Sequence, residues 1–107
     1  MKRFALTLLF LAACGGGDDD PSPEQSCLDV ADAVGDLCVR CTLDTYENCR
    51  NTVLQAANGD CSQVKAIRNV DELYGQCLPF TTTVACDVAA SEGFELDSSC
   101  KGQLLLQ

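Results

Sequence analysis

The chain has 107 residues, with sixteen acidic side chains against seven basic ones and a formal net charge of −9. It contains neither histidine nor tryptophan. An acidic chain of this kind does not suit nucleic acid or anionic lipid headgroups, which bind basic patches. The absence of histidine excludes Ser-His-Asp and Cys-His catalysis, as well as histidine-ligated metal sites.

The first fourteen residues have the order of an export signal. Lys2 and Arg3 form a short basic start, and an apolar run interrupted only by Thr7 extends to residue 13, directly before Cys14. This run is too short to span a bilayer, which takes about 20 residues. We therefore predict that residues 1–13 are a signal peptide that is removed. Five basic residues then remain against sixteen acidic ones, because Lys2 and Arg3 leave with the signal.

The segment Leu11-Ala12-Ala13-Cys14 resembles the lipobox of bacterial lipoproteins. The resemblance implies that the Cys14 thiol receives a diacylglycerol and that its freed amine is usually acylated, with palmitate among the expected acyl chains. Each buried methylene contributes about 0.8 kcal/mol, so two or three chains give a durable membrane anchor. The resemblance places the protein in the bacterial cell envelope. Gly15 rather than an aspartate follows the cysteine, which favours the outer membrane over the inner membrane. The alternative is an ordinary signal peptide with a chance cysteine.

Residues 14–25 are rich in glycine, aspartate and proline, which predicts a lipidated, flexible and disordered tether. The aspartate triplet at 18–20 lacks the alternating ligand spacing of a calcium loop, so we interpret it as a solvated spacer.

Residues 26–107 then form the folded, cysteine-rich domain. Its eight cysteines are an even number in a short exported chain, which predicts four disulfides. These cysteines are Cys27, Cys38, Cys41, Cys49, Cys61, Cys77, Cys86 and Cys100.

Apolar residues recur at helical spacing through most of this domain, which predicts an all-α bundle of about four short helices stapled by disulfides. Ser26 is predicted to cap the first helix and Asp44 the second, each with an acidic residue three positions later. Asn58-Gly59 ends the second helix. A third runs from about 62 to 77, with a break into two shorter helices near 68–71 as an alternative. Pro79 ends it and can start the next element. A fourth covers about 80–90. An extended segment follows at 94–97, and the apolar tail 102–107 packs back on the bundle.

The disulfide pairing follows from the directions of these helices. In an up-and-down bundle sequential helices run antiparallel, which places Cys27 and Cys61 at one end and the other six cysteines at the opposite end. Disulfide partners need Cα atoms within about 7 Å of each other. We therefore predict the pairs Cys27–Cys61, Cys41–Cys49, Cys86–Cys100 and, by elimination, Cys38–Cys77. Exchange of partners between Cys38 and Cys41 is the alternative.

Two groups of residues invite a chemical interpretation. Cys38-Val39-Arg40-Cys41 has the spacing of redox and zinc motifs, but it closes a predicted helix, the unfavourable end for a thiolate, so structural disulfides are favoured. Asp29, Asp32 and Asp36 lie on the polar stripe of the first helix, which indicates a solvated face rather than an acid–base pair. We predict no catalytic residue, metal ligand or cofactor, and no enzymatic activity.

Two segments, Cys77-Leu78-Pro79-Phe80 and the stretch Leu96–Leu104, resemble small cysteine-rich lipoproteins predicted in myxobacteria and related bacteria. That resemblance covers residues 27–104 and carries no activity with it. Plant lipid-transfer proteins also combine eight cysteines with four helices, but they require adjacent Cys-Cys and Cys-x-Cys pairs, which this chain lacks. We predict a membrane-anchored envelope lipoprotein with a non-enzymatic binding or interaction domain, for instance for another envelope protein. The alternative is a carrier of a small apolar ligand, in the periplasm or at the cell surface.

Overall fold

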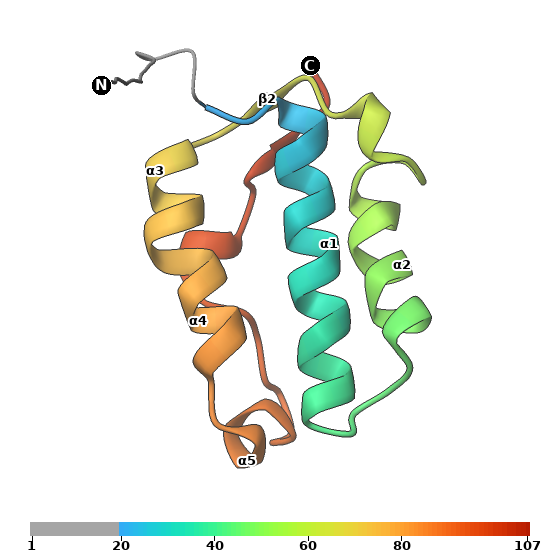
Figure 1. Cartoon of the computed structure of the whole chain (residues 1–107), viewed down its shortest axis with the longest axis vertical. Helices are drawn as coiled ribbons and strands as arrows, with labels where there is room; N and C mark the ends of the chain where they lie inside the picture. The colour runs from blue at the N-terminus through green and yellow to red at the C-terminus, as the bar shows by residue number, and fades with distance from the viewer. Residues whose placement is uncertain (1–19) are drawn as a thin grey trace, which may run out of the picture.

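The computed structural model describes residues 20–107, which form a small all-α domain with one long helix at its centre (Figure 1). This central helix is α1 (Pro23–Arg40), and α2 (Tyr46–Ala56) lies antiparallel to it on one side. On the other side, α3 (Val70–Glu72), the π-helix η3 (Leu73–Cys77) and α4 (Leu78–Thr83) follow one another as a single rod. The predicted all-α, disulfide-stapled architecture is confirmed.

Helix α1 begins earlier than predicted. The Ser22 hydroxyl accepts a hydrogen bond from the Gln25 N–H at 3.1 Å, and Pro23 occupies the first helical position, where its missing N–H costs nothing. The predicted cap, Ser26, is instead fully buried inside the helix. The folded domain therefore starts at Pro23 rather than at residue 26. The predicted signal peptide, Cys14 and the first part of the tether lie outside the described residues.

Helix α2 is capped one residue later than predicted. Thr45 is the N-cap, and its hydroxyl accepts from the Asn48 N–H at 3.1 Å. The Asp44 carboxylate accepts from the Asn48 side chain and the Thr45 N–H, and these hydrogen bonds lower its pKa. The helix ends where the sequence predicted, because Asn58 and Gly59 adopt positive φ angles of 57° and 94°.

The third predicted helix is wrong in its first half. The 3₁₀ helix η2 (Cys61–Gln63) leads into the strand β2 (Ala66–Ile67), which pairs antiparallel with β3 (Leu104–Leu105) of the tail. Backbone N–H groups of Lys65 and Arg68 also donate to carbonyls of the tail, at 2.7 and 2.9 Å. These partners lie more than thirty residues away, so a local pattern could not reveal them. The tail does pack back on the bundle, as predicted.

Pro79 does not end the helix that contains it. The Leu78 N–H donates to the carbonyl of Leu73, five residues earlier, and this wide π turn precedes the proline. Proline has no N–H, and in a regular helix its ring clashes with the carbonyl four residues before it. The π turn removes that clash, so the rod continues through Pro79. The prediction that Pro79 can start the next element is confirmed, because it is an early residue of α4.

The predicted fourth helix is also divided. Helix α4 stops at Thr83, and α5 (Cys86–Ala89) starts after the extended residues Val84 and Ala85. The guanidinium of Arg40 lies at this break and donates to the carbonyls of Val84 at 3.0 Å and Thr81 at 3.4 Å. These acceptors belong to the end of α4, where carbonyls lose their helical partners. The side chain from α1 therefore stabilises the interruption. After Gly93 the chain turns back and passes through the 3₁₀ helix η4 (Ser98–Cys100).

The core consists of three clusters of buried residues, and α1 contributes to each of them. The first lies near the start of α1, the second at its middle and the third near its end. Their buried members are Cys27, Ala57, Cys61 and Val64 in the first, Val30, Leu73 and Cys77 in the second, and Leu37, Val84 and Ala89 in the third. Burial of one stripe of α1 against both neighbours therefore holds the domain together.

Four disulfides pair all eight cysteines of the domain. They are Cys27–Cys61, Cys38–Cys49, Cys41–Cys86 and Cys77–Cys100. The predicted pair Cys27–Cys61 is confirmed. The predicted pairs Cys41–Cys49, Cys86–Cys100 and Cys38–Cys77 are wrong.

Helix geometry explains why Cys38 rather than Cys41 pairs with Cys49, as the alternative prediction had it. Cys49 lies three residues into α2, about 4.5 Å from its start at a rise of 1.5 Å per residue. Cys38 lies the same distance before Cys41 at the end of α1, so Cys38 and Cys49 are level. Cys41 is left at the tip of the helix.

The continuous helix through Pro79 explains the other two errors. A helix ending at Pro79 would have placed Cys77 at the same end as Cys41, with Cys86 beside it. Instead Cys77 lies midway along the α3–η3–α4 rod, and Cys86 follows beyond its end, beside Cys41. The returning segment passes Cys77 on its way back, which brings Cys100 to it.

Candidate functional site

The motif Cys38-Val39-Arg40-Cys41 contributes two structural disulfides. Cys38 and Cys41 do not pair with each other, because each forms a disulfide with a different element, α2 for Cys38 and α5 for Cys41. Across residues 20–107, no group of three or more histidine, cysteine, aspartate or glutamate side chains is placed to hold a metal ion. The predicted lipidation residue, Cys14, lies outside the described residues.

Two carboxylates of α1 connect it to its neighbours. Asp29 accepts from the Tyr74 hydroxyl at 2.5 Å, and Asp32 accepts from the Tyr46 hydroxyl at 2.8 Å and from Arg50 Nε at 3.1 Å. Burial of its ring, with the bond to Asp29, raises the pKa of Tyr74, and the bond to Asp32 raises the pKa of Tyr46. These carboxylates therefore link α1 by hydrogen bonds to η3 on one side and to α2 on the other. The sequence predicted a solvated face for Asp29, Asp32 and Asp36. Asp32 and Asp36 are exposed, whereas Asp29 is half-buried, and the sequence did not reveal the tyrosine partners.

An apolar cavity of about 200 Å³ lies between α1, α2 and the returning C-terminal segment. Its lining comes from Val30, Val53, Ala56, Leu96, Cys100, Gly102, Gln103 and Leu104. Ala56 and Gly102 are exposed and mark its mouth, whereas Val30 and Gln103 are buried. The apolar spacing of the first two predicted helices indicates Val30, Val53 and Ala56 as buried positions, whereas the walls from Leu96 to Leu104 depend on where the tail packs.

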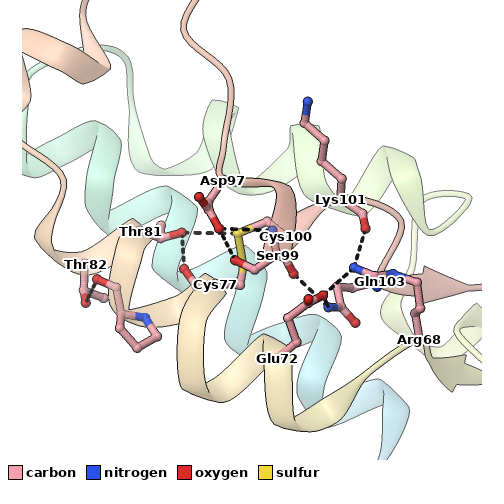
Figure 2. The surroundings of a disulfide bond; sticks show 11 residues. Arg68, Glu72, Cys77, Thr81, Thr82, Asp97, Ser99, Cys100, Lys101 and Gln103 are labelled. Carbon is pink, nitrogen blue, oxygen red and sulfur yellow. Dashed lines mark hydrogen bonds and ion pairs between the residues drawn. A yellow bond between two sulfur atoms is a disulfide. The ribbon is translucent and has the colours of Figure 1, made fainter.

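Gln103 is a polar member of this lining, and Figure 2 shows the hydrogen bonds of its amide nitrogen to Ser99 and Glu72. Its amide nitrogen donates to the Ser99 carbonyl at 2.8 Å and to Glu72 Oε1 at 3.2 Å, and its amide oxygen accepts from the Asn69 N–H at 2.9 Å. Arg68 also donates to Glu72 Oε1, at 2.7 Å. Because both amide hydrogens are in use, Gln103 offers the cavity no free donor. The glutamine was missed at the sequence level, since it stands in an apolar tail without alternation.

Three exposed apolar side chains lie at one end of the domain. Val39, at the end of α1, is 58 % exposed, Val88, in α5, is 48 % exposed, and Leu43, in the α1–α2 connection, is 37 % exposed. The Cys41–Cys86 disulfide, with a Cα–Cα distance of 5.1 Å, joins the two segments that carry them. In Figure 1 this end, with α5, is opposite the end where the described chain begins. We call it the distal end.

Comparison with protein-family models, curated proteins and solved structures found no match to this chain. Among residues 20–107, every helix is too short or too polar to cross a membrane.

Proposed function

We propose that this protein is a lipid-anchored envelope lipoprotein that displays a non-enzymatic interaction domain. The lipobox-like segment ending at Cys14 supports the anchor, which would lie six residues before Asp20. Helix α1 has 18 residues and a length of about 27 Å. With an anchor ahead of Asp20, α1 would hold the distal end away from the bilayer.

The single observation that supports an interaction role is the grouping of Val39, Leu43 and Val88 at that distal end. Exposed acidic side chains flank them, including Asp44 and Asp87. The exposed Arg40 also lies at this end, but its guanidinium donates to the carbonyls of Val84 and Thr81. Apolar side chains with a mainly acidic rim favour a partner with apolar anchors and a complementary, basic rim. We therefore propose a protein partner with a basic surface at the cell envelope.

Site-specific photo-crosslinking in intact cells tests this role. A photoreactive residue at Val88 should form a discrete adduct, whereas the same residue at exposed Lys65, near the opposite end, should not. Charge reversal at Asp44 and Asp87 should weaken the Val88 adduct. Equal labelling from both positions, or an adduct indifferent to charge reversal, would contradict a specific distal interface.

The anchor needs a separate test. Changing Cys14 to Ala should abolish incorporation of labelled palmitate and move the protein out of the detergent-rich fraction. Retention of the acyl label in the variant would exclude Cys14 as the lipidation site.

The apolar cavity favours a second candidate function, carriage of a small apolar ligand. A cavity of about 150 Å³ lined by aliphatic residues is large enough for benzene, so this one suits a single ring or a short alkyl group. The satisfied Gln103 amide leaves little to recognise a polar group. A ligand without hydrogen-bonding groups would fit best.

Titration with toluene, followed by ¹H–¹³C NMR of methyl groups, tests this candidate. The methyl signals of Val30, Val53 and Leu104 should shift together with a saturable dependence on toluene. Ala56→Leu should fill the mouth and abolish the shifts, whereas Gln55→Leu, one residue away on α2 and outside the lining, should preserve them. Identical titrations for the two variants would show that toluene binds elsewhere.

A further inference from the structure

The Cys41–Cys86 bridge differs from the other disulfides of the described domain in its surroundings. Cys27 and Cys61 are both buried, and each of the two remaining bridges has one buried member, Cys38 or Cys77. Cys41 and Cys86 are both partly exposed. An attacking thiol can therefore reach this bridge without opening the core.

A cation also lies beside one of its two sulfurs. Arg40 Nη1 is 3.6 Å from Cys86 Sγ, and the same guanidinium is held in place by the carbonyls of Val84 and Thr81. A neighbouring arginine lowers the pKa of a cysteine thiol because it stabilises the thiolate. In thiol–disulfide exchange, the sulfur that becomes the more stable thiolate leaves faster. Cys86 is thus the favoured leaving group, and Cys41 the sulfur that is attacked.

We propose that Cys41–Cys86 is a thiol–disulfide exchange site, selectively opened by an exposed dithiol reductant. A thiolate of the reductant bonds to Cys41 Sγ, the Sγ–Sγ bond breaks, and its electron pair leaves on Cys86 as a thiolate paired with Arg40. The second thiol of the reductant then displaces Cys41 and closes the reductant's own disulfide. Two electrons pass from the dithiol to the bridge, and the two protons of the dithiol are available to Cys41 and Cys86.

Opening this bridge has a local consequence. It releases the covalent link between the end of α1 and α5. Two disulfides still join α1 to η2 and α2, and the third still joins the α3–η3–α4 rod to the returning segment. Val84 and Ala89 still pack against Leu37 in the core. We therefore expect the reduced form to remain folded, with the change confined to α5 and its flanks.

Limited reduction of the full mature chain in detergent tests the proposal. Substoichiometric dithiothreitol, quenching with N-ethylmaleimide and non-reducing peptide mapping should find Cys41 and Cys86 alkylated while the other six cysteines stay paired. A brief exposure to the monothiol glutathione should place the mixed disulfide on Cys41. Earlier reduction of any other bridge, or a glutathione adduct mainly on Cys86, would overturn the proposal.

Variants of Arg40 separate electrostatics from packing. Arg40→Met should slow the reduction of Cys41–Cys86 by about threefold or more, because it removes the cation that stabilises the departing thiolate. Arg40→Lys should restore part of the rate, because it retains the charge. Arg50→Met, which removes an arginine paired with Asp32 on the other side of α1, is the matched control and should leave the rate unchanged.

A purely structural Arg40 predicts the opposite sign, because loosening the end of α4 would expose the bridge and speed its reduction. A faster or unchanged rate in folded Arg40→Met, checked by circular dichroism, would therefore refute the role of Arg40. If that variant does not fold, Arg40→Lys and the position of the glutathione adduct in the natural chain still decide the question.

Discussion

The contact between Gly35 and Tyr46 allows a sharp test of how α1 and α2 pack. A methyl group added at Gly35 would lie 2.6 Å from Cδ2 and 2.7 Å from Cε2 of the Tyr46 ring. Alanine carbons do not approach aromatic carbons so closely, so either the ring or helix α2 would have to move. Movement of the ring would also strain the hydrogen bond from the Tyr46 hydroxyl to Asp32.

The expected effect of Gly35→Ala is the difference between two opposing contributions. Alanine in a helix interior is favoured over glycine by about 1 kcal/mol. Overpacking costs about 1–3 kcal/mol, and weakening a hydrogen bond to a carboxylate costs about 1 kcal/mol more. We therefore expect the variant to lose about 2 kcal/mol of unfolding free energy. For a domain of this size, that loss lowers Tm by about 10 °C.

Gly75→Ala is the matched control. Gly75 also lies in a helical segment, but nothing stands within 4 Å of its added methyl group. This substitution should stabilise the domain by about 0.5–1 kcal/mol. Thermal and guanidinium unfolding, followed by circular dichroism with the disulfides intact, would measure both variants.

A Tyr46→Ala background completes the test of this contact. Without the ring, Gly35→Ala should become stabilising, as at Gly75. A stabilising effect of Gly35→Ala in the natural chain would refute the proposed packing of Tyr46 on α1. A penalty that persists in the Tyr46→Ala background would refute it equally.

Three further variants test the packing of the C-terminal tail, the stability at low pH and the contribution of one disulfide. Gln103→Ala removes three hydrogen bonds from a buried group and should cost about 3 kcal/mol in guanidinium unfolding; a loss below 1 kcal/mol would contradict the network. Hydrogen bonds from η4 lower the pKa of Asp97, so its contribution is present above its ordinary pKa of 3.8 and is lost as pH falls through the folded value. Asp97→Asn should therefore lose less stability between pH 6 and pH 2 than the natural chain, and equal losses would argue against this coupling. Closure of the loop between Cys27 and Cys61, separated by 34 residues, contributes about 4 kcal/mol in the chain-entropy model, so the double alanine variant should show the corresponding fall in Tm.

The sequence by itself determined the class of the fold, the presence of its first two helices and the end of the second. Apolar spacing of three and four identified α1 and α2, and Asn58-Gly59 marked the end of α2 because both residues accept positive φ. The even cysteine count indicated a disulfide framework, and antiparallel helix directions predicted Cys27–Cys61 correctly. These features depend on residues near one another in the chain or on simple bundle geometry. Local physical chemistry is therefore sufficient to predict them.

Only the tertiary structure decided the rest. The strand at 66–67 forms because the tail supplies its hydrogen-bond partners, and the cavity exists because that tail crosses α1 and α2. Pro79 continues a helix because a π turn removes the clash that would otherwise end it. Because the helix continues through Pro79, Cys86 lies beside Cys41, and Cys77 lies beside Cys100. Disulfide pairing depends on the three-dimensional path of the whole chain, so a single misjudged helix end was enough to misassign these bridges.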